Sequence, residues 1–144
     1  MSRILAIDPS LTSTGIAIDV DRESMTVLHL TTTKRGVARL AYFRREIQHL
    51  IAAGIDAAYI EGYAYGRPNQ SHQLGELGGV IRLALYDASI PTTIVPPSSL
   101  KMYAAGKGNA PKTDVLANVI RRFGYMGSNQ DEADAIALWH LAHH

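Results

Sequence analysis

The chain has 144 residues, 47% of them apolar and 19% charged, a balance typical of a soluble globular protein with one core. Its lack of cysteine excludes disulfides and thiolate metal sites. No apolar run is long enough for a signal peptide or a membrane span, so we expect a single cytoplasmic domain over residues 1–144, without a membrane partner. The net charge of +1 says little about partners, but the segment between Lys101 and Arg122 is rich in basic residues, and the segment after Asn129 has acids and no Lys or Arg.

The N-terminal half predicts three strands joined by short turns, a helix and a fourth strand. The strands are expected over residues 3–7 (ending at Asp8), 15–20 and 25–30, the amphipathic helix over 36–53, and the fourth strand over 57–61. Because crossover connections between parallel strands are right-handed and pack on the sheet, the fourth strand should lie parallel beside the first.

The C-terminal half predicts a loop, four helices and one more strand. The loop is expected over residues 62–70, the helices over 71–88, 98–105, 111–123 and about 128–140, and the strand over 92–95, where two prolines stop it. The order of elements predicts an α/β fold with a mixed five-stranded sheet flanked by helices.

Two carboxylates end buried strands. Asp8 follows four apolar residues, and Glu61 follows another apolar run. Parallel neighbours lie about 4.8 Å apart, so these acids would meet at one edge of the sheet and repel each other unless a cation lay between them. Either acid alone could be an ordinary exposed residue at a strand end.

A third acidic position lies at the start of the last helix. Asp131 and Asp134 are three residues apart and share a helix face, whereas Glu132 points roughly 100° away. The apolar remainder of the helix should pack on the sheet and bring these acids toward Asp8 and Glu61. An alternative role for Asp131 is helix capping, since residues 128–131 resemble a capping box.

Such a cluster favours hard divalent cations, which bind oxygen ligands. Two ions roughly 4 Å apart can activate a water and stabilise the leaving oxygen of a phosphodiester. The sequence has no close histidine pair for zinc, and the histidines at 140, 143 and 144 are interpreted as residues of a frayed tail.

Residues 7–15, IDPSLTSTG, resemble the first motif of RuvC-type Holliday-junction resolvases, and Ile60-Glu61 resembles their second acidic position. Further matches follow in the family's order: LG and GV within residues 74–80, a basic segment from Pro96 to Lys112, and DEADAIA at residues 131–137.

The resemblance implies a ribonuclease H-like fold and a homodimeric endonuclease that cuts four-way DNA junctions with Mg²⁺ or Mn²⁺, with two ions per site. It implies that four acids hold the metals, namely Asp8, Glu61, Asp131 and Asp134. Lys101 and Lys112 would lie near the scissile phosphate as catalytic cations, and Lys107 would contact DNA.

The chain departs from the family pattern at two places. Ser10 replaces the usual glycine, so that turn cannot freely use positive φ. After Glu61, where relatives often carry a phenylalanine that wedges at the junction, this loop carries Tyr63, Tyr65 and Arg67, which we expect to contact DNA. Packing of either tyrosine on the rim of the fold is the alternative.

Glycines at 75, 78 and 79 fall within the second predicted helix. Each costs up to about 1 kcal/mol in a helix interior, so they suggest close approach of another backbone. The sheet, DNA and the same helix of a second subunit are all candidates.

Three other functions fit parts of the sequence. A ribonuclease H-like nuclease could act on flaps, other branched DNA or structured RNA with the same chemistry. An actin-like ATPase fragment would use Asp8 and residues 12–15 as a phosphate-binding hairpin, but needs a second such domain. A junction-binding protein without activity would not need four clustered acids, which are costly on a DNA-binding face.

Overall fold

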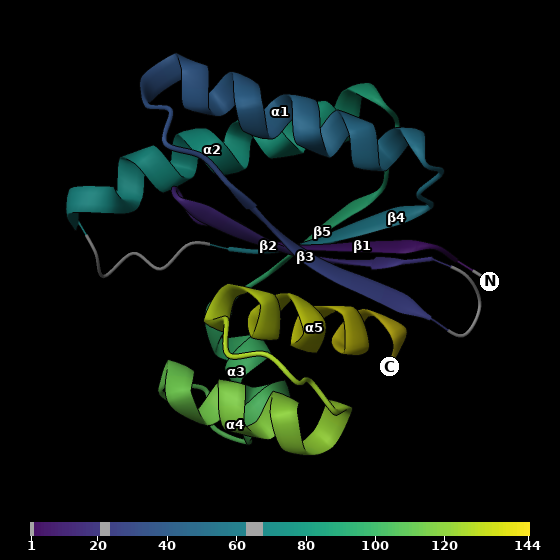
Figure 1. Ribbon diagram of the computed structural model, residues 1–144, viewed down its shortest axis with the longest axis vertical. Coiled ribbons are helices and arrows are strands. Elements are labelled where there is room, and N and C mark those ends of the chain that lie inside the picture. The colour runs from purple at the N-terminus through teal and green to yellow at the C-terminus, as the bar shows by residue number, and fades with distance from the viewer. Residues whose placement is uncertain (1, 21–23, 63–67) are drawn as a thin grey trace.

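A computed structural model describes residues 2–20, 24–62 and 68–144 (Figure 1). The strands are β1 (Ile4–Asp8), β2 (Ser13–Asp19), β3 (Met25–Thr31), β4 (Ala57–Glu61) and β5 (Thr92–Val95). The helices are α1 (Gly36–Ala52), α2 (Pro68–Asp87), α3 (Pro97–Ala105), α4 (Lys112–Phe123) and α5 (Gln130–His143).

The strands form one mixed sheet in the order β3-β2-β1-β4-β5. The meander β1–β3 is antiparallel, and β4 and β5 continue the sheet parallel to β1. The predicted parallel pairing of the first and fourth strands is therefore confirmed. Its register pairs Ile7 with Ile60, so Asp8 and Glu61 follow as neighbours at the same edge.

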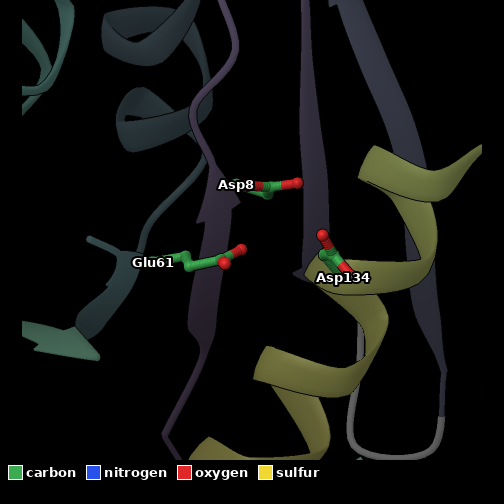
Figure 2. A group of neighbouring side chains, drawn as sticks. All are labelled: Asp8, Glu61 and Asp134. Atoms are coloured by element: carbon green, nitrogen blue, oxygen red, sulfur yellow. The ribbon is translucent and has the colours of Figure 1, made fainter. Parts of the chain in front are cut away.

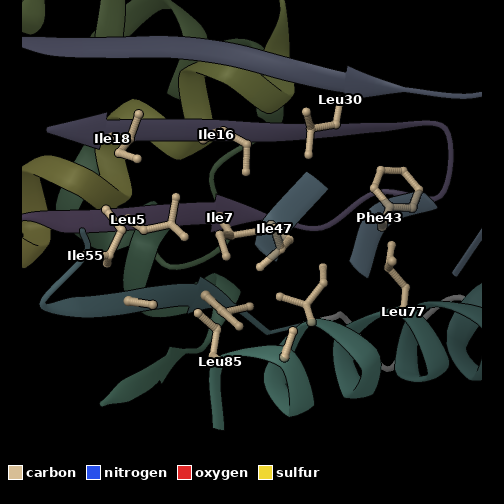
Figure 3. Packing of buried hydrophobic residues seen from close by; sticks show 14 residues of the cluster. Leu5, Ile7, Ile16, Ile18, Leu30, Phe43, Ile47, Ile55, Leu77 and Leu85 are labelled. Atoms are coloured by element: carbon tan, nitrogen blue, oxygen red, sulfur yellow. The ribbon is translucent and has the colours of Figure 1, made fainter. Parts of the chain in front are cut away.

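The sheet separates two groups of helices, with α1 and α2 on one face and α3, α4 and α5 on the other (Figure 1). Because side chains alternate along a strand, Leu5 and Ile7 of β1 face α1 and α2, where they pack with Phe43 and Leu77 (Figure 3). Asp8, like Ala6, points to the opposite face of the sheet, on which α5 packs.

Small side chains allow α5 to lie close to the sheet. Ala6 of β1 and Ala17 of β2 are register partners, both are fully buried, and they pack in one cluster with Ala133 and Ala137 of α5. Alanine against alanine brings the helix backbone near the strands. The first turn of α5, with its acids, therefore comes close to the end of β1.

The second strand, expected over residues 15–20, spans Ser13–Asp19, and two helix ends also differ from the prediction. The second helix begins at Pro68 rather than at residue 71, because proline has a φ suited to the first helical position and has no N–H to leave unpaired there. The last helix continues to His143, whose Nε2 lies 3.1 Å from Asp19 Oδ2. His140 stacks on Phe123, with the two ring centroids 3.8 Å apart. These histidines are packed rather than frayed.

No helix in the described parts of the chain has both the length and the apolar character needed to cross a bilayer.

Candidate metal centre

Three carboxylates converge from three elements, Asp8 at the end of β1, Glu61 at the end of β4 and Asp134 in α5 (Figure 2). One oxygen from each lies within 4.8 Å of the others. Asp8 and Asp134 are both 6% exposed, so water cannot fully screen their repulsion. The sequence-based prediction that these acids meet at one edge of the sheet is confirmed.

Asp131 lies beside this group but outside the tight cluster. Its side chain is 23% exposed and lines the same cleft. The cap of α5 is made by Asn129, whose Oδ1 accepts a hydrogen bond from the Glu132 amide at 2.8 Å. The hydrogen bond of the cap is therefore made by another residue, and Asp131 is left facing the cleft.

Burial and mutual repulsion make these acids hard to ionise together. Burial, followed by the charges of Glu61 and Asp134, raises the pKa of Asp8 well above its usual range. Burial also raises the pKa of Glu61. For Asp134, burial and then the charge of Glu61 raise the pKa to about 7. A bound cation would reverse this balance.

Unpartnered oxygens support a cation site here. Asp8 Oδ2 and Glu61 Oε2 are buried and have no hydrogen-bond partner within the described part of the chain. Buried polar atoms are usually paired, so these two oxygens are available as ligands for a cation. Because all the donors are carboxylate oxygens, the set fits a hard divalent cation.

Lys112, at the start of α4, provides a cation at the edge of the cluster. Its Nζ lies 3.8 Å from Asp134 Oδ2 and 4.0 Å from Asp131 Oδ1. Burial alone would lower the pKa of Lys112, but the surrounding carboxylates, beginning with Asp8, outweigh burial and raise it. The ammonium group therefore stays charged beside the acids.

A cleft of about 1060 Å³ opens over the acids. Lys101 of α3 lines it together with Lys112, whereas Lys107 is exposed in the link between α3 and α4 and is not among the lining residues. Tyr63, Tyr65 and Arg67 lie outside the described residues. The structure thus brings two of the predicted lysines to the acids.

Two arginines that sequence reasoning missed line the same cleft. Arg39 comes from α1 and Arg82 from α2. Within the described segments, neither forms a salt bridge. Sequence patterns gave no signal for them, because each reads as an ordinary polar residue on an amphipathic helix.

The turn after Asp8 is stabilised by a side chain instead of by glycine. Thr14 Oγ1 donates to the Ser10 carbonyl at 2.9 Å and accepts from the Ser10 amide at 3.2 Å. Ser89 is the one non-glycine residue with positive φ among those described, so Ser10 does not need that conformation. Replacement of the usual glycine is therefore accommodated without strain.

The raised pKa values predict that the metal-free protein loses stability as pH rises. A carboxyl with a raised folded pKa contributes most below its unfolded pKa of about 4, and the contribution is lost as pH rises through the folded value. That value is about 7 for Asp134. In chelator, we expect the melting temperature to fall from about pH 5 to about pH 8, and less steeply for Asp134→Asn.

Mn²⁺ should raise the melting temperature more at about pH 8 than at about pH 5, because binding releases protons from the acids. Thermal melts across this range test both expectations. A decline in Asp134→Asn as steep as in the wild type would contradict the role given to this carboxyl.

Comparison of the sequence with protein families matches residues 4–143 to the family described as crossover junction endodeoxyribonuclease RuvC. A RuvC from Sorangium cellulosum is 29% identical, with 97% of this chain and 84% of the relative covered. A RuvC from Leifsonia xyli is 32% identical, covering 94% of this chain and 71% of the relative. The similarity therefore extends over nearly the whole chain.

Among solved structures, Thermus thermophilus RuvC in complex with a Holliday junction substrate superposes with a TM-score of 0.77. The two chains are 21% identical, and the superposition covers 96% of this chain and 90% of the other. This likeness establishes the fold, which is the ribonuclease H-like fold predicted from the sequence.

Proposed function

The chain belongs to the RuvC family of crossover junction endodeoxyribonucleases, and from this premise we propose that it cuts four-way DNA junctions by paired symmetric nicks. The products would carry 5′-phosphate and 3′-hydroxyl ends. The observation that carries the proposal is the group of three acids, which have oxygens within 4.8 Å of one another and line one cleft.

Asp8, Glu61 and Asp134 would hold a divalent cation, with Mg²⁺ the expected ion and Mn²⁺ a substitute. Asp131 lines the same cleft and would complete a site for two ions. Bound ions supply Lewis acidity and an activated water. The four acids thereby fix where on the DNA the attack occurs.

Lys112 and Lys101 would act on the substrate phosphate. Both line the cleft, and Lys112 lies at the acids. An ammonium group here would offset the negative charge that grows on the phosphate in the transition state. Because the acids keep Lys112 charged, it can do this throughout the pH range in which they are ionised.

The remaining predicted contacts concern the path of the DNA. Arg39 of α1 and Arg82 of α2 line one side of the cleft, and neither has an acidic partner in the described segments. Such cations are expected to contact phosphates. Lys107 would contact phosphates just outside the cleft. Tyr63, Tyr65 and Arg67 follow Glu61 directly in the chain, so bases that they stack on would be held beside the acids.

A panel of substrates tests the proposal. Four-way junction, three-way junction, flap, linear duplex and structured RNA are each incubated with Mg²⁺, with Mn²⁺ and with chelator. We expect preferential cutting of the four-way junction, by paired nicks, and no cutting in chelator. Equal cutting of flaps would indicate a general nuclease of branched DNA. Cutting of RNA alone would replace the proposal with an RNA-processing function.

Paired nicks require two active sites, and a two-fold dimer supplies them. We propose that α2 forms the interface. Gly79, Leu83 and Tyr86 recur at helical spacing along it, and Leu83 and Tyr86 are 58% and 79% exposed. A Cβ at Gly79 would meet nothing within 4 Å, so the subunit's own sheet does not require this glycine. A second copy can approach closely there.

Charge on this face should separate the subunits. We expect the wild type to sediment as a dimer at micromolar concentration and Leu83→Glu/Tyr86→Glu to sediment as a monomer, because a desolvated carboxylate is costly at an interface. Met126→Glu is the control, since Met126 is 99% exposed in the link before α5. A wild-type protein that stays monomeric both free and on a junction would contradict the dimer.

A further inference from the structure

Glu132 belongs to the acidic stretch that begins α5, but its carboxylate does not join the metal-binding group. Its Oε2 lies 2.5 Å from His29 Nδ1 of β3. Its Oε1 accepts a hydrogen bond from the Tyr125 hydroxyl at 2.8 Å. One side chain therefore ties the first turn of the helix to the outer strand of the sheet and to the segment before the helix.

The same contacts complete the cap of α5 in an uncommon way. In a capping box, the acid at the third helical position reaches back to the amide of the cap residue. Here the Asn129 amide donates to the Tyr125 hydroxyl at 3.1 Å, and that hydroxyl donates to Glu132. The tyrosine thus connects the two ends of the cap.

Glycine at 127 makes room for this tyrosine. A Cβ at Gly127 would lie 2.5 Å from the Tyr125 hydroxyl oxygen and 2.6 Å from its Cζ. Any larger residue would push the ring away from Glu132. The segment between α4 and α5 is therefore shaped around the hydrogen bond to Glu132.

The sheet register connects these contacts to the metal-binding group. Asp8 of β1 pairs with Gly15 of β2, and Gly15 pairs with His29 of β3, so the three residues form one row across the sheet. The first turn of α5 lies along that row. The Asp131 backbone carbonyl occupies the space where a Cβ of Gly15 would be, and Glu132 bonds His29.

We propose that Glu132 is a positioning residue that acts through His29 and Tyr125. It fixes the first turn of α5 against the row of the sheet that carries Asp8, and so sets the distance from Asp134 to Asp8 and Glu61. The inference rests on the proposed metal-dependent cleavage. A carboxylate that touches neither metal nor substrate would thus control how well the site binds its ions.

The test compares Glu132→Ala, Glu132→Gln and His29→Ala with the wild type. We expect Glu132→Ala to weaken Mn²⁺ binding about tenfold or more and to lower kcat, with the KM for junction DNA unchanged, as residues that orient metal ligands do. Glu132→Gln can still accept from Tyr125 and should retain most of the affinity. A double variant, His29→Ala/Glu132→Ala, is also compared. Its loss should be little larger than that of Glu132→Ala alone, because both substitutions remove the contact between His29 and Glu132.

Asp114→Ala is the matched control, because Asp114 is an exposed acid in the first turn of another helix, α4. Hydrogen exchange of the amides in the first turn of α5 gives a second readout. It should accelerate in Glu132→Ala and not in the control. Unchanged exchange and Mn²⁺ affinity within twofold of wild type would overturn the inference alone. A wild type that neither binds Mn²⁺ nor cuts would overturn the proposed function as well.

Discussion

Asp8→Asn is expected to abolish cutting, with a loss of at least about a thousandfold in rate, while junction binding is retained. Metal ions contribute several kcal/mol to transition-state stabilisation in such sites, and each 1.36 kcal/mol is a factor of ten. Asp8 is a buried ligand candidate, 6% exposed, and one of its oxygens lies within 4.8 Å of oxygens of both Glu61 and Asp134. Removing its charge does not weaken the attraction between the lysines and the phosphates.

The same substitution should also stabilise the metal-free protein at about pH 8. The asparagine side chain carries no charge, so burial and the repulsion from Glu61 and Asp134, which together raise the pKa of Asp8, would no longer act on a charged group at this position. Cleavage assays, binding in chelator and thermal melts measure the three effects together. Asp114→Asn, the same change at an exposed acid of α4, should leave all three at wild-type values. Cutting by Asp8→Asn at near wild-type rate would mean that the metal site is elsewhere.

The central acids could be found from the sequence because local pattern and topology act together. Asp8 and Glu61 each end an apolar run, and the two strands and one helix between the runs return the chain so that the runs become parallel neighbours. Asp134 follows from helix periodicity and from the apolar face that α5 packs on the sheet. These inferences need only the direction of strands and the pitch of a helix.

Other parts of the site depend on contacts between residues far apart in sequence. Glu132 and His29 are 103 residues apart, and nothing in the pattern around either indicates the other. Arg39 and Arg82 join the cleft only because α1 and α2 cover the same face of the sheet. The position of Lys107 outside the cleft follows from the path of the chain after α3, which composition does not encode.

Gly15→Ala is expected to affect both stability and catalysis although residue 15 carries no functional group. A Cβ there would overlap the backbone carbonyl of Asp131, and a backbone atom cannot rotate away as a side chain can. The first turn of α5 would have to move from β2. Overpacking of this kind costs about 1–3 kcal/mol, and a displacement of about 1 Å at a catalytic group can cost about a hundredfold in rate.

The same exchange at Gly79 separates this steric effect from the general effect of alanine. A Cβ at Gly79 meets nothing within 4 Å in its own subunit and lies inside helix α2. In the Leu83→Glu/Tyr86→Glu background, where no second copy covers α2, Gly79→Ala should therefore raise the free energy of unfolding by up to about 1 kcal/mol. Gly15→Ala should lower it and should also weaken Mn²⁺ binding, since Asp131 and Asp134 move with the helix. Denaturant unfolding and Mn²⁺ titration distinguish the two variants. If Gly15→Ala bound Mn²⁺ and cut junctions like the wild type, close contact between β2 and α5 would not be what sets the geometry of the acids.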